Sequence, residues 1–240
     1  MPSKKILWLV FFLIIGCTPS TTPTPYATPI VWQIARTPSL SWLDQSFNLC
    51  IQEQNENRII VHEAPLDSTL FHSANISFIW GRPVQLQEFA YTLGEDELVF
   101  VVHPDNPLQE ISLETLRNIY SKQEVYWQEG QSRIVVPWKY PENNEIQRLA
   151  EELMGDSSEK NVQLSTTPDI AGMLAQISLN PDAIGFLPKN RVDSSVKPIL
   201  IAGLSPQSTT FPVIALLQSE PDRFQNLWMA CIQEKIAADQ

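Results

Sequence analysis

The stretch VVHPDNPLQEISLETLRNIYSK, residues 101–122, decides the fold. It holds the end of an apolar strand, a turn rich in proline and asparagine, and a short helix. In that helix Leu113, Leu116 and Tyr120 recur at i, i+3 and i+7, which predicts one buried face. A strand that passes through a turn into a helix is typical of α/β proteins, in which helices connect the strands of a sheet.

The same alternation continues on both sides of this stretch. Apolar runs predict strands at residues 30–36, 58–62, 75–80, 97–103, 133–137, 162–165, 183–187, 196–201 and 211–217. Amphipathic segments predict helices that begin near residues 39, 112, 144, 167 and 220. The pattern indicates an α/β sheet with right-handed crossovers. The strands form two sets, divided near Pro104 and near Pro188, so we expect two lobes.

Composition excludes several classes of function. The 240 residues are 43% hydrophobic, and 16 Lys and Arg against 27 Asp and Glu give a net charge of −11, which argues against a nucleic-acid partner. The eight glycines are widely spaced, so glycine-rich phosphate loops and the GxSxG elbow are absent. No nucleophile–base set stands out, and the three histidines have no metal-ligand spacing with the cysteines. We therefore expect neither an enzyme nor a metal or cofactor site.

The amino terminus reads as an export signal. Lys4 and Lys5 precede an apolar run over residues 6–15, which is too short to span a bilayer and is followed by Gly16 and Cys17. The ending LIIGC resembles a bacterial lipobox, although Ile15 stands where a small residue is usual. This predicts a signal peptide over residues 1–16 and a Cys17 that carries diacylglycerol and palmitate. A plain signal peptide and an uncut anchor remain the alternatives.

A tether is expected between the anchor and the folded body. Residues 17–29 are rich in Thr and Pro, cannot build a core, and should extend as polyproline II. The body would then lie at the extracytoplasmic face of the cell membrane. In an oxidising compartment Cys50 and Cys231 could form a disulfide, and two separate buried thiols are the alternative.

Three segments carry a resemblance to a known family. Residues 101–122 with Trp127, the return segment NPDAIGFLP at 180–188, and the segment at 73–83 ending in GRP are similar to phosphate-type (type 2) periplasmic solute-binding proteins. Their order and spacing agree, and together they cover most of residues 30–240. The resemblance implies a two-lobe α/β fold with two crossover strands and a ligand in the cleft between the lobes. Lobe I would comprise residues 30–104 and 189–240, and lobe II residues 105–188.

The resemblance also implies where a ligand binds. One oxyanion loop of the family corresponds to residues 37–41, and the other to residues 140–145. A guanidinium that forks onto anions would come from Arg82, with Trp80 as an aromatic wall. The candidate ligand-binding residues are Ser39, Leu40, Ser41, Trp80, Arg82, Tyr140, Asn143 and Asn144. Core packing of Trp80 and Tyr140, an ion pair of Arg82 and helix capping by Asn144 are the structural alternatives.

The two loops depart from the family's pattern. Pro38 removes one N–H donor from the first loop, and Glu142 and Glu145 put two carboxylates into the second. Like charges about 4 Å apart repel by about 4 kcal/mol at an effective dielectric near 20, more than a helix terminus returns. Phosphate specificity should therefore not be transferred. Inorganic phosphate, another small ligand and no ligand at all stay open.

These observations favour a monomeric, lipid-anchored solute-binding protein. It would close over a small molecule or oxyanion by a hinge near residues 103–105 and 188–191, and present it to the permease of an ABC transporter. The alternative is a sensor or interaction lipoprotein on the same scaffold with a degenerate ligand site. An extracytoplasmic enzyme is disfavoured because the chain offers no catalytic constellation.

Overall fold

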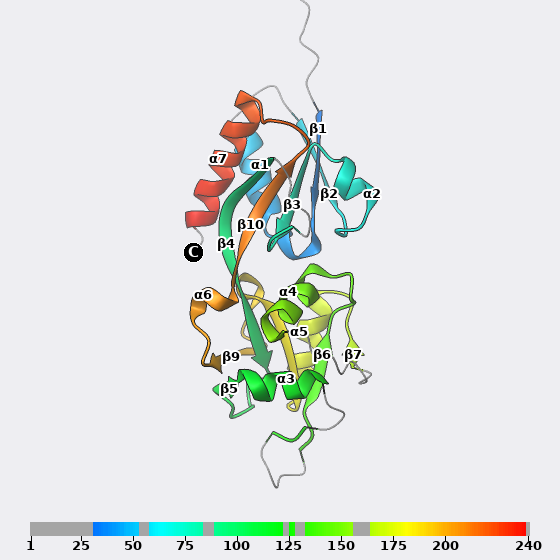
Figure 1. Cartoon of the computed structure of the whole chain (residues 1–240), viewed down its shortest axis with the longest axis vertical. Coiled ribbons are helices and arrows are strands. Elements are labelled where there is room, and N and C mark those ends of the chain that lie inside the picture. The colour runs from blue at the N-terminus through cyan, green and yellow to red at the C-terminus, as the bar shows by residue number, and fades with distance from the viewer. Residues whose placement is uncertain are drawn as a thin grey trace, which may run out of the picture.

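The computed structural model of the chain describes residues 31–52, 58–83, 89–121, 125–127, 133–155 and 164–238. The predicted signal peptide, Cys17 and the tether lie outside the described residues. The body is an elongated α/β structure with two lobes, one above the other in Figure 1.

Strands and helices alternate along most of the chain. The strands are β1 (Val31–Arg36), β2 (Arg58–Glu63), β3 (Ile76–Trp80), β4 (Phe89–Val102), β5 (Glu110–Ser112), β6 (Val136–Lys139), β7 (Ser165–Thr166), β8 (Ala183–Pro188), β9 (Lys197–Ala202) and β10 (Thr210–Leu217). The α-helices are α1 (Leu43–Gln52), α2 (Thr69–Ser73), α3 (Leu113–Ser121), α4 (Glu145–Met154), α5 (Ile170–Leu179), α6 (Pro206–Thr209) and α7 (Arg223–Ala238). Two 3-10 turns, η1 (Pro38–Leu40) and η2 (Lys189–Arg191), complete the elements.

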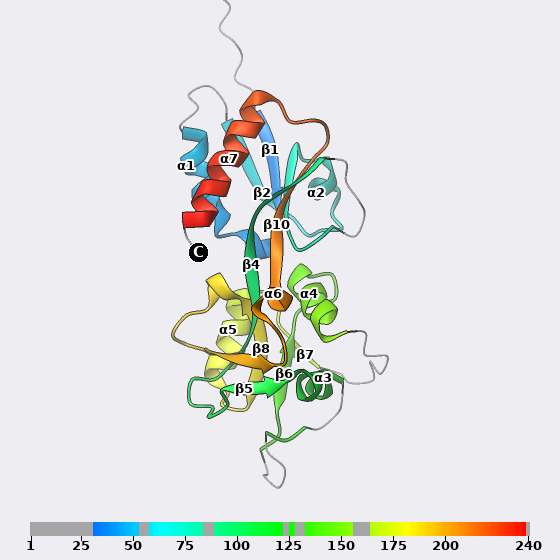
Figure 2. The same cartoon turned by 60° about the vertical axis from the view of Figure 1, so that its left-hand side comes forward.

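One strand runs through both lobes. The sheet order is β2-β1-β3-β10-β4-β8-β6-β7, with β9 paired to β4 and β5. The first part of β4 pairs antiparallel with β10 in lobe I, and its last residues pair with β8 and β9 in lobe II. Figures 1 and 2 show β4 passing from the upper lobe into the lower one. The predicted α/β fold with two lobes is confirmed in this arrangement.

The lobes divide at other residues than the sequence suggested. The partner of β4 changes from β10 to β8 between Glu97 and Leu98, before the predicted boundary after residue 104. Strand β9, predicted in lobe I, pairs with β5 and with the lobe II end of β4. The reason is that β4 is one continuous strand of 14 residues, so Pro104 follows its end and does not mark the crossing. From here on, lobe I means residues 31–97 and 210–238, and lobe II means residues 98–209.

The two faces of the lobe I sheet are covered unequally. Helices α1 and α7 cover one face, where Phe47, Phe78 and Trp228 are fully buried and contact one another. The other face carries a smaller apolar cluster under α2, a helix of only five residues. The large core therefore lies between the sheet and the α1–α7 layer.

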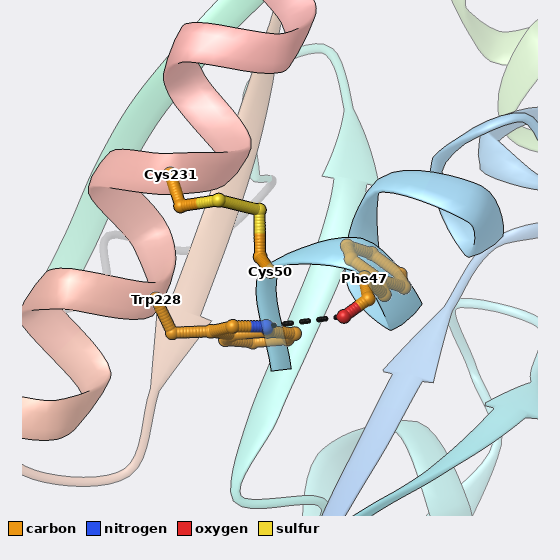
Figure 3. Close-up of a disulfide and its surroundings, with 4 residues drawn as sticks. All are labelled: Phe47, Cys50, Trp228 and Cys231. Atoms are coloured by element: carbon orange, nitrogen blue, oxygen red, sulfur yellow. Dashed lines mark hydrogen bonds between the residues drawn. A yellow bond between two sulfur atoms is a disulfide. The ribbon is translucent and has the colours of Figure 1, made fainter. Parts of the chain in front are cut away.

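A disulfide joins α1 to α7 above this core. Cys50 and Cys231 are bonded, with 5.8 Å between their Cα atoms and a separation of 181 positions in sequence. Figure 3 shows the bond next to Trp228, whose indole N–H donates to the backbone oxygen of Phe47 at 3.4 Å. The bond ties the first helix of lobe I to its last.

Among the described residues, no helix has the length and apolar character that crossing a membrane requires.

Removing the disulfide should destabilise lobe I. Closing a loop of this length lowers the entropy of the unfolded chain and contributes up to about 5 kcal/mol in the chain-entropy model. We expect the double variant Cys50→Ala, Cys231→Ala to unfold at a clearly lower urea concentration than the oxidised wild type. A reducing agent should remove the difference between the two proteins, and equal midpoints under oxidising conditions would contradict this role.

Candidate functional site

Three segments from the two lobes meet at one buried point. Lobe I supplies η1 after β1, and Trp80 at the end of β3; lobe II supplies the first turn of α4. Thr37, Ser39 and Glu145 are all buried there, at 0%, 1% and 3% exposure. Buried polar groups need hydrogen-bond partners, and Glu145 of lobe II finds them across the lobe boundary in Ser39 and Trp80.

The lobe I side of the site is a loop anchored to the sheet. The N–H of Thr37 donates to the backbone oxygen of Phe78 at 3.2 Å, which ties the loop to β3. Pro38 occupies the first position of η1, where no N–H is needed, and so leaves the turn intact. Ser39 follows with its hydroxyl directed toward lobe II, where it donates to a carboxylate oxygen of Glu145.

Glu145 of lobe II reaches across to these donors. Asn144 caps α4, its side-chain oxygen accepting the N–H of Ile146 at 2.8 Å, and this sets Glu145 as the first residue of the helix. One oxygen of Glu145 accepts the Ser39 hydroxyl, and the other accepts the backbone N–H of Trp80 at 3.2 Å. We call Ser39, Trp80 and Glu145 the interlobe seat. Its carboxylate is bound as a ligand anion would be, by a hydroxyl and a main-chain N–H.

Burial makes this carboxylate hold its proton more tightly. Loss of solvent raises the pKa of Glu145 from 4.5 to about 7, against hydrogen bonds from Ser39, Thr37 and the Trp80 N–H and the charge of Arg148, which lower it. Its position at the start of α4 also favours the charged form. The group therefore titrates near neutral pH.

The lobes approach closely beside the seat. A Cβ at Gly81 would lie 2.5 Å from Cδ2 of Leu149 in α4, and Gly81 has a φ of +87°, so only glycine fits there. Arg148 of α4 donates from Nη2 to the backbone oxygen of Trp80 at 3.3 Å. These contacts hold the two lobes in a closed arrangement.

Several predicted ligand residues are core residues. Leu40, Trp80 and Tyr140 are fully buried. The Trp80 indole donates to Phe211 at 3.2 Å, and the Tyr140 hydroxyl donates to Phe186 at 3.3 Å, so neither ring forms an open wall. Trp80 reaches the seat through its backbone N–H only.

The remaining predicted residues lie around the seat. Asn144 caps α4, Asn143 is exposed on the preceding loop, and Ser41 is half-buried at the end of η1. Arg82 is exposed, and within the described part of the chain no carboxylate forms an ion pair with it. Of the eight predicted residues the structure brings Ser39 and Trp80 into direct contact with the seat's carboxylate, and Asn144 positions it.

Two contributors were missed as ligating groups. The sequence predicts Glu145 only as a carboxylate that repels a bound anion, and it gives Arg148 no role. They lie three residues apart at the start of α4, a spacing that puts both on one helix face next to the predicted loop. That spacing could have indicated that both side chains belong to the site. Which groups of lobe I they contact depends on how the lobes are placed and could not be read from it.

The interlobe seat predicts a pH dependence of stability. The folded chain keeps a proton on Glu145 that the unfolded chain loses between pH 4.5 and about 7. The free energy of unfolding should therefore be highest below pH 4.5 and fall by up to about 3 kcal/mol as pH rises through this window. Opening the lobes gives the carboxylate another way to ionise, which makes this figure an upper bound.

Urea unfolding of wild type and of Glu145→Gln at about pH 5 and about pH 8 measures this effect. The variant should lose the part of the pH dependence that Glu145 causes. Asp96 serves as the matched comparison, because burial raises its pKa from 3.8 to about 7 in the same direction. Identical pH profiles for wild type and Glu145→Gln, with a flatter profile for Asp96→Asn alone, would assign the effect to Asp96.

Comparison with solved structures shows the fold. A phosphate ABC transporter substrate-binding protein from Clostridium perfringens, with bound phosphate, aligns with a TM-score of 0.74 and 16% identity over 87% of this chain and 96% of that chain. An ABC-type phosphate transport receptor from Vibrio cholerae aligns at 0.67 with 19% identity, over 86% and 95%. The reduced OxyR regulatory domain from Pseudomonas aeruginosa aligns at 0.61 with 10% identity, over 86% and 98%.

Sequence comparison adds nothing to this. No protein-family model matches the chain, and no curated protein is detectably similar to it. Identities this low show the architecture alone, and the similar structures include both binding proteins and regulatory domains. The chain has the mixed α/β fold of type 2 periplasmic-binding-protein-like structures.

Proposed function

We propose that the protein is a lipid-anchored, extracytoplasmic solute-binding protein that closes two lobes over a small solute and presents it to an ABC transporter. The observation that carries the proposal is the interlobe seat. Hydrogen-bond donors of lobe I, from Ser39 and Trp80, converge with a carboxylate of lobe II on one buried point. Clefts of α/β proteins bind ligands at such points, beyond the carboxyl ends of strands and at helix N-termini.

Inorganic oxyanions do not suit this seat. A phosphate bound between Ser39 and Trp80 would meet the carboxylate of Glu145, which already uses both donors. Repulsion of about 4 kcal/mol per pair of like charges at 4 Å opposes its entry. The seat instead suits a solute that displaces Glu145 with a neutral acceptor, or one that offers its own donors or positive charge to it.

Entry of a solute requires the lobes to open. Two segments cross between them, at Glu97–Leu98 within β4 and at Thr209–Thr210 between α6 and β10. A hinge at these positions would separate Ser39 and Trp80 from Glu145 without breaking the sheet of either lobe. The cost of opening is the loss of the seat's hydrogen bonds and of the contact between Gly81 and Leu149.

A second candidate is a sensor or interaction lipoprotein with a cleft that stays closed. One observation favours it: Glu145 satisfies the lobe I donors from within the chain, so the closed arrangement needs no ligand. In that case opening, and not capture of a solute, would be the signal.

Substitution of Glu145 tests the seat directly. Glu145→Ala removes the internal carboxylate and frees the Ser39 hydroxyl and the Trp80 N–H. We expect wild type to show no thermal shift with phosphate, sulfate or molybdate, and Glu145→Ala to gain a shift with at least one of them. Glu142→Ala, an exposed carboxylate on the same loop, is the control and should behave as wild type. A strong phosphate response of wild type, or no response of Glu145→Ala to any oxyanion, would contradict the assignment of the seat.

A solute panel separates the two candidate functions. The panel contains sugars, amino acids and polyamines. A compound that binds should, at 100 times its dissociation constant, stabilise the wild type by about 2.7 kcal/mol, or about 5–10 °C for a body of this size. Small-angle scattering shows whether the lobes are open before the solute is added. A shift with closure supports the solute-binding protein, and a protein that is closed throughout and responds to no solute supports the sensor.

The proposed anchor has its own test. Cys17→Ser should move the protein from the membrane fraction to the soluble extracytoplasmic fraction and abolish incorporation of radiolabelled palmitate, because stable attachment depends on the acyl chains. Retention of the variant on the membrane with labelling lost would show that a different contact holds it there. Ser20→Ala, in the predicted tether, is the matched control and should leave labelling and membrane attachment intact.

A further inference from the structure

A pocket lies outside the interlobe seat, on the face of lobe I that carries α2. It has a volume of about 320 Å³ and opens beside α2, over the sheet strands β3 and β10. Its volume is at the lower end of the range for small-molecule sites. We call it the α2 pocket.

The floor of the α2 pocket is apolar. Phe71 of α2, Ile79 of β3 and Leu216 of β10 line it and are at most 8% exposed. They belong to a cluster separate from the main core, on the face that carries the five-residue helix α2. A hydrocarbon or aromatic body placed here would leave water and contact these side chains.

The rim of the pocket carries two guanidinium groups. Arg82 follows β3 in lobe I and Arg148 comes from α4 in lobe II, so the pocket is lined from both lobes. The described lining of the pocket includes this pair and no Asp or Glu. It makes the rim electrostatically complementary to an anionic group.

Arg148 retains a donor for that group. Its Nη2 donates to the backbone of Trp80 at 3.3 Å, and its Nη1 lies 3.7 Å from Glu152. Its Nε is buried and has no acceptor among the residues that the structure describes. Since this Nε has almost no accessible surface, a ligand carboxylate would meet the outer part of the guanidinium, whose Nη1 makes only this long contact to Glu152 among the ion pairs of the described residues.

We propose that the α2 pocket binds a small organic monocarboxylate, with its apolar body on Phe71, Ile79 and Leu216 and its carboxylate between Arg82 and Arg148. Such a ligand bridges the lobes next to the interlobe seat and favours their closed arrangement. The inference rests on the pocket and its charges and does not depend on what the seat binds.

Titration calorimetry with phenylacetate and octanoate, each beside its uncharged amide, tests the proposal on the wild-type protein. We expect both acids to bind and both amides to bind about tenfold or more weakly, because the amides lack the charge-assisted hydrogen bonds. Inorganic phosphate, which has no apolar body, should not compete. No binding of either acid at millimolar concentration, equal binding of acids and amides, or full competition by phosphate would each overturn the proposal.

Variants locate the site. Arg82→Gln and Arg148→Gln should each weaken binding of the acids about tenfold or more, and Arg58→Gln, an exposed arginine at the start of β2, should leave it unchanged. His72→Trp, an exposed position on the pocket rim, should block binding by filling the mouth while the protein stays folded. Unchanged affinity in Arg82→Gln and His72→Trp would overturn the proposal. Because Arg148 comes from lobe II, this pocket also needs the closed lobes, so binding of the acids is measured with Glu145 intact. Loss of binding in Arg82→Gln, which leaves the seat's contacts in place, reports on the pocket and not on the seat.

Discussion

A buried carboxylate of lobe II joins the two lobes. Glu145, the first residue of α4, accepts hydrogen bonds from the Ser39 hydroxyl and the Trp80 N–H of lobe I. Its burial raises its pKa to about 7, so the same contact that joins the lobes also opposes ionisation. An internal contact between the lobes shifts the equilibrium between their open and closed arrangements toward closure, and whatever separates the lobes must contribute more than this contact does.

Most of the architecture could be predicted from local patterns. Apolar runs located most of the strands, and the alternation with helices determined the α/β class, because each pattern reports burial within its own segment. Strand β5 and the first eight residues of β4 were not predicted. The crossing points could not be located in this way. Strand β4 continues through both lobes, so no proline, glycine or change of composition marks the change of its partner at Glu97–Leu98.

The candidate site could be predicted only in part, for a related reason. The loop containing Ser39 and the end of β3 at Trp80 follow strands, and strand ends could be found from the sequence. Whether an aromatic side chain lines a cleft or packs in the core depends on neighbours from distant segments. Here the indole N–H of Trp80 donates to the backbone oxygen of Phe211, and the hydroxyl of Tyr140 donates to that of Phe186. The sequence does predict that the carboxylates of Glu142 and Glu145 repel phosphate. The contact of Glu145 with Ser39 and with the Trp80 N–H could not be predicted, because it depends on how the two lobes are placed relative to each other.

The order of strands in lobe I has a consequence for how the chain folds as it emerges. Strand β10 lies between β3 and β4, and the partner of Cys50 lies on the last helix. Lobe I therefore lacks the middle of its sheet and its covalent closure until nearly the whole chain has been delivered. Lobe II is one continuous stretch, residues 98–209, and can assemble earlier as a unit. Until the carboxyl-terminal segment is available, the edge of β3 that pairs with β10 has no partner strand, and lobe I is completed last.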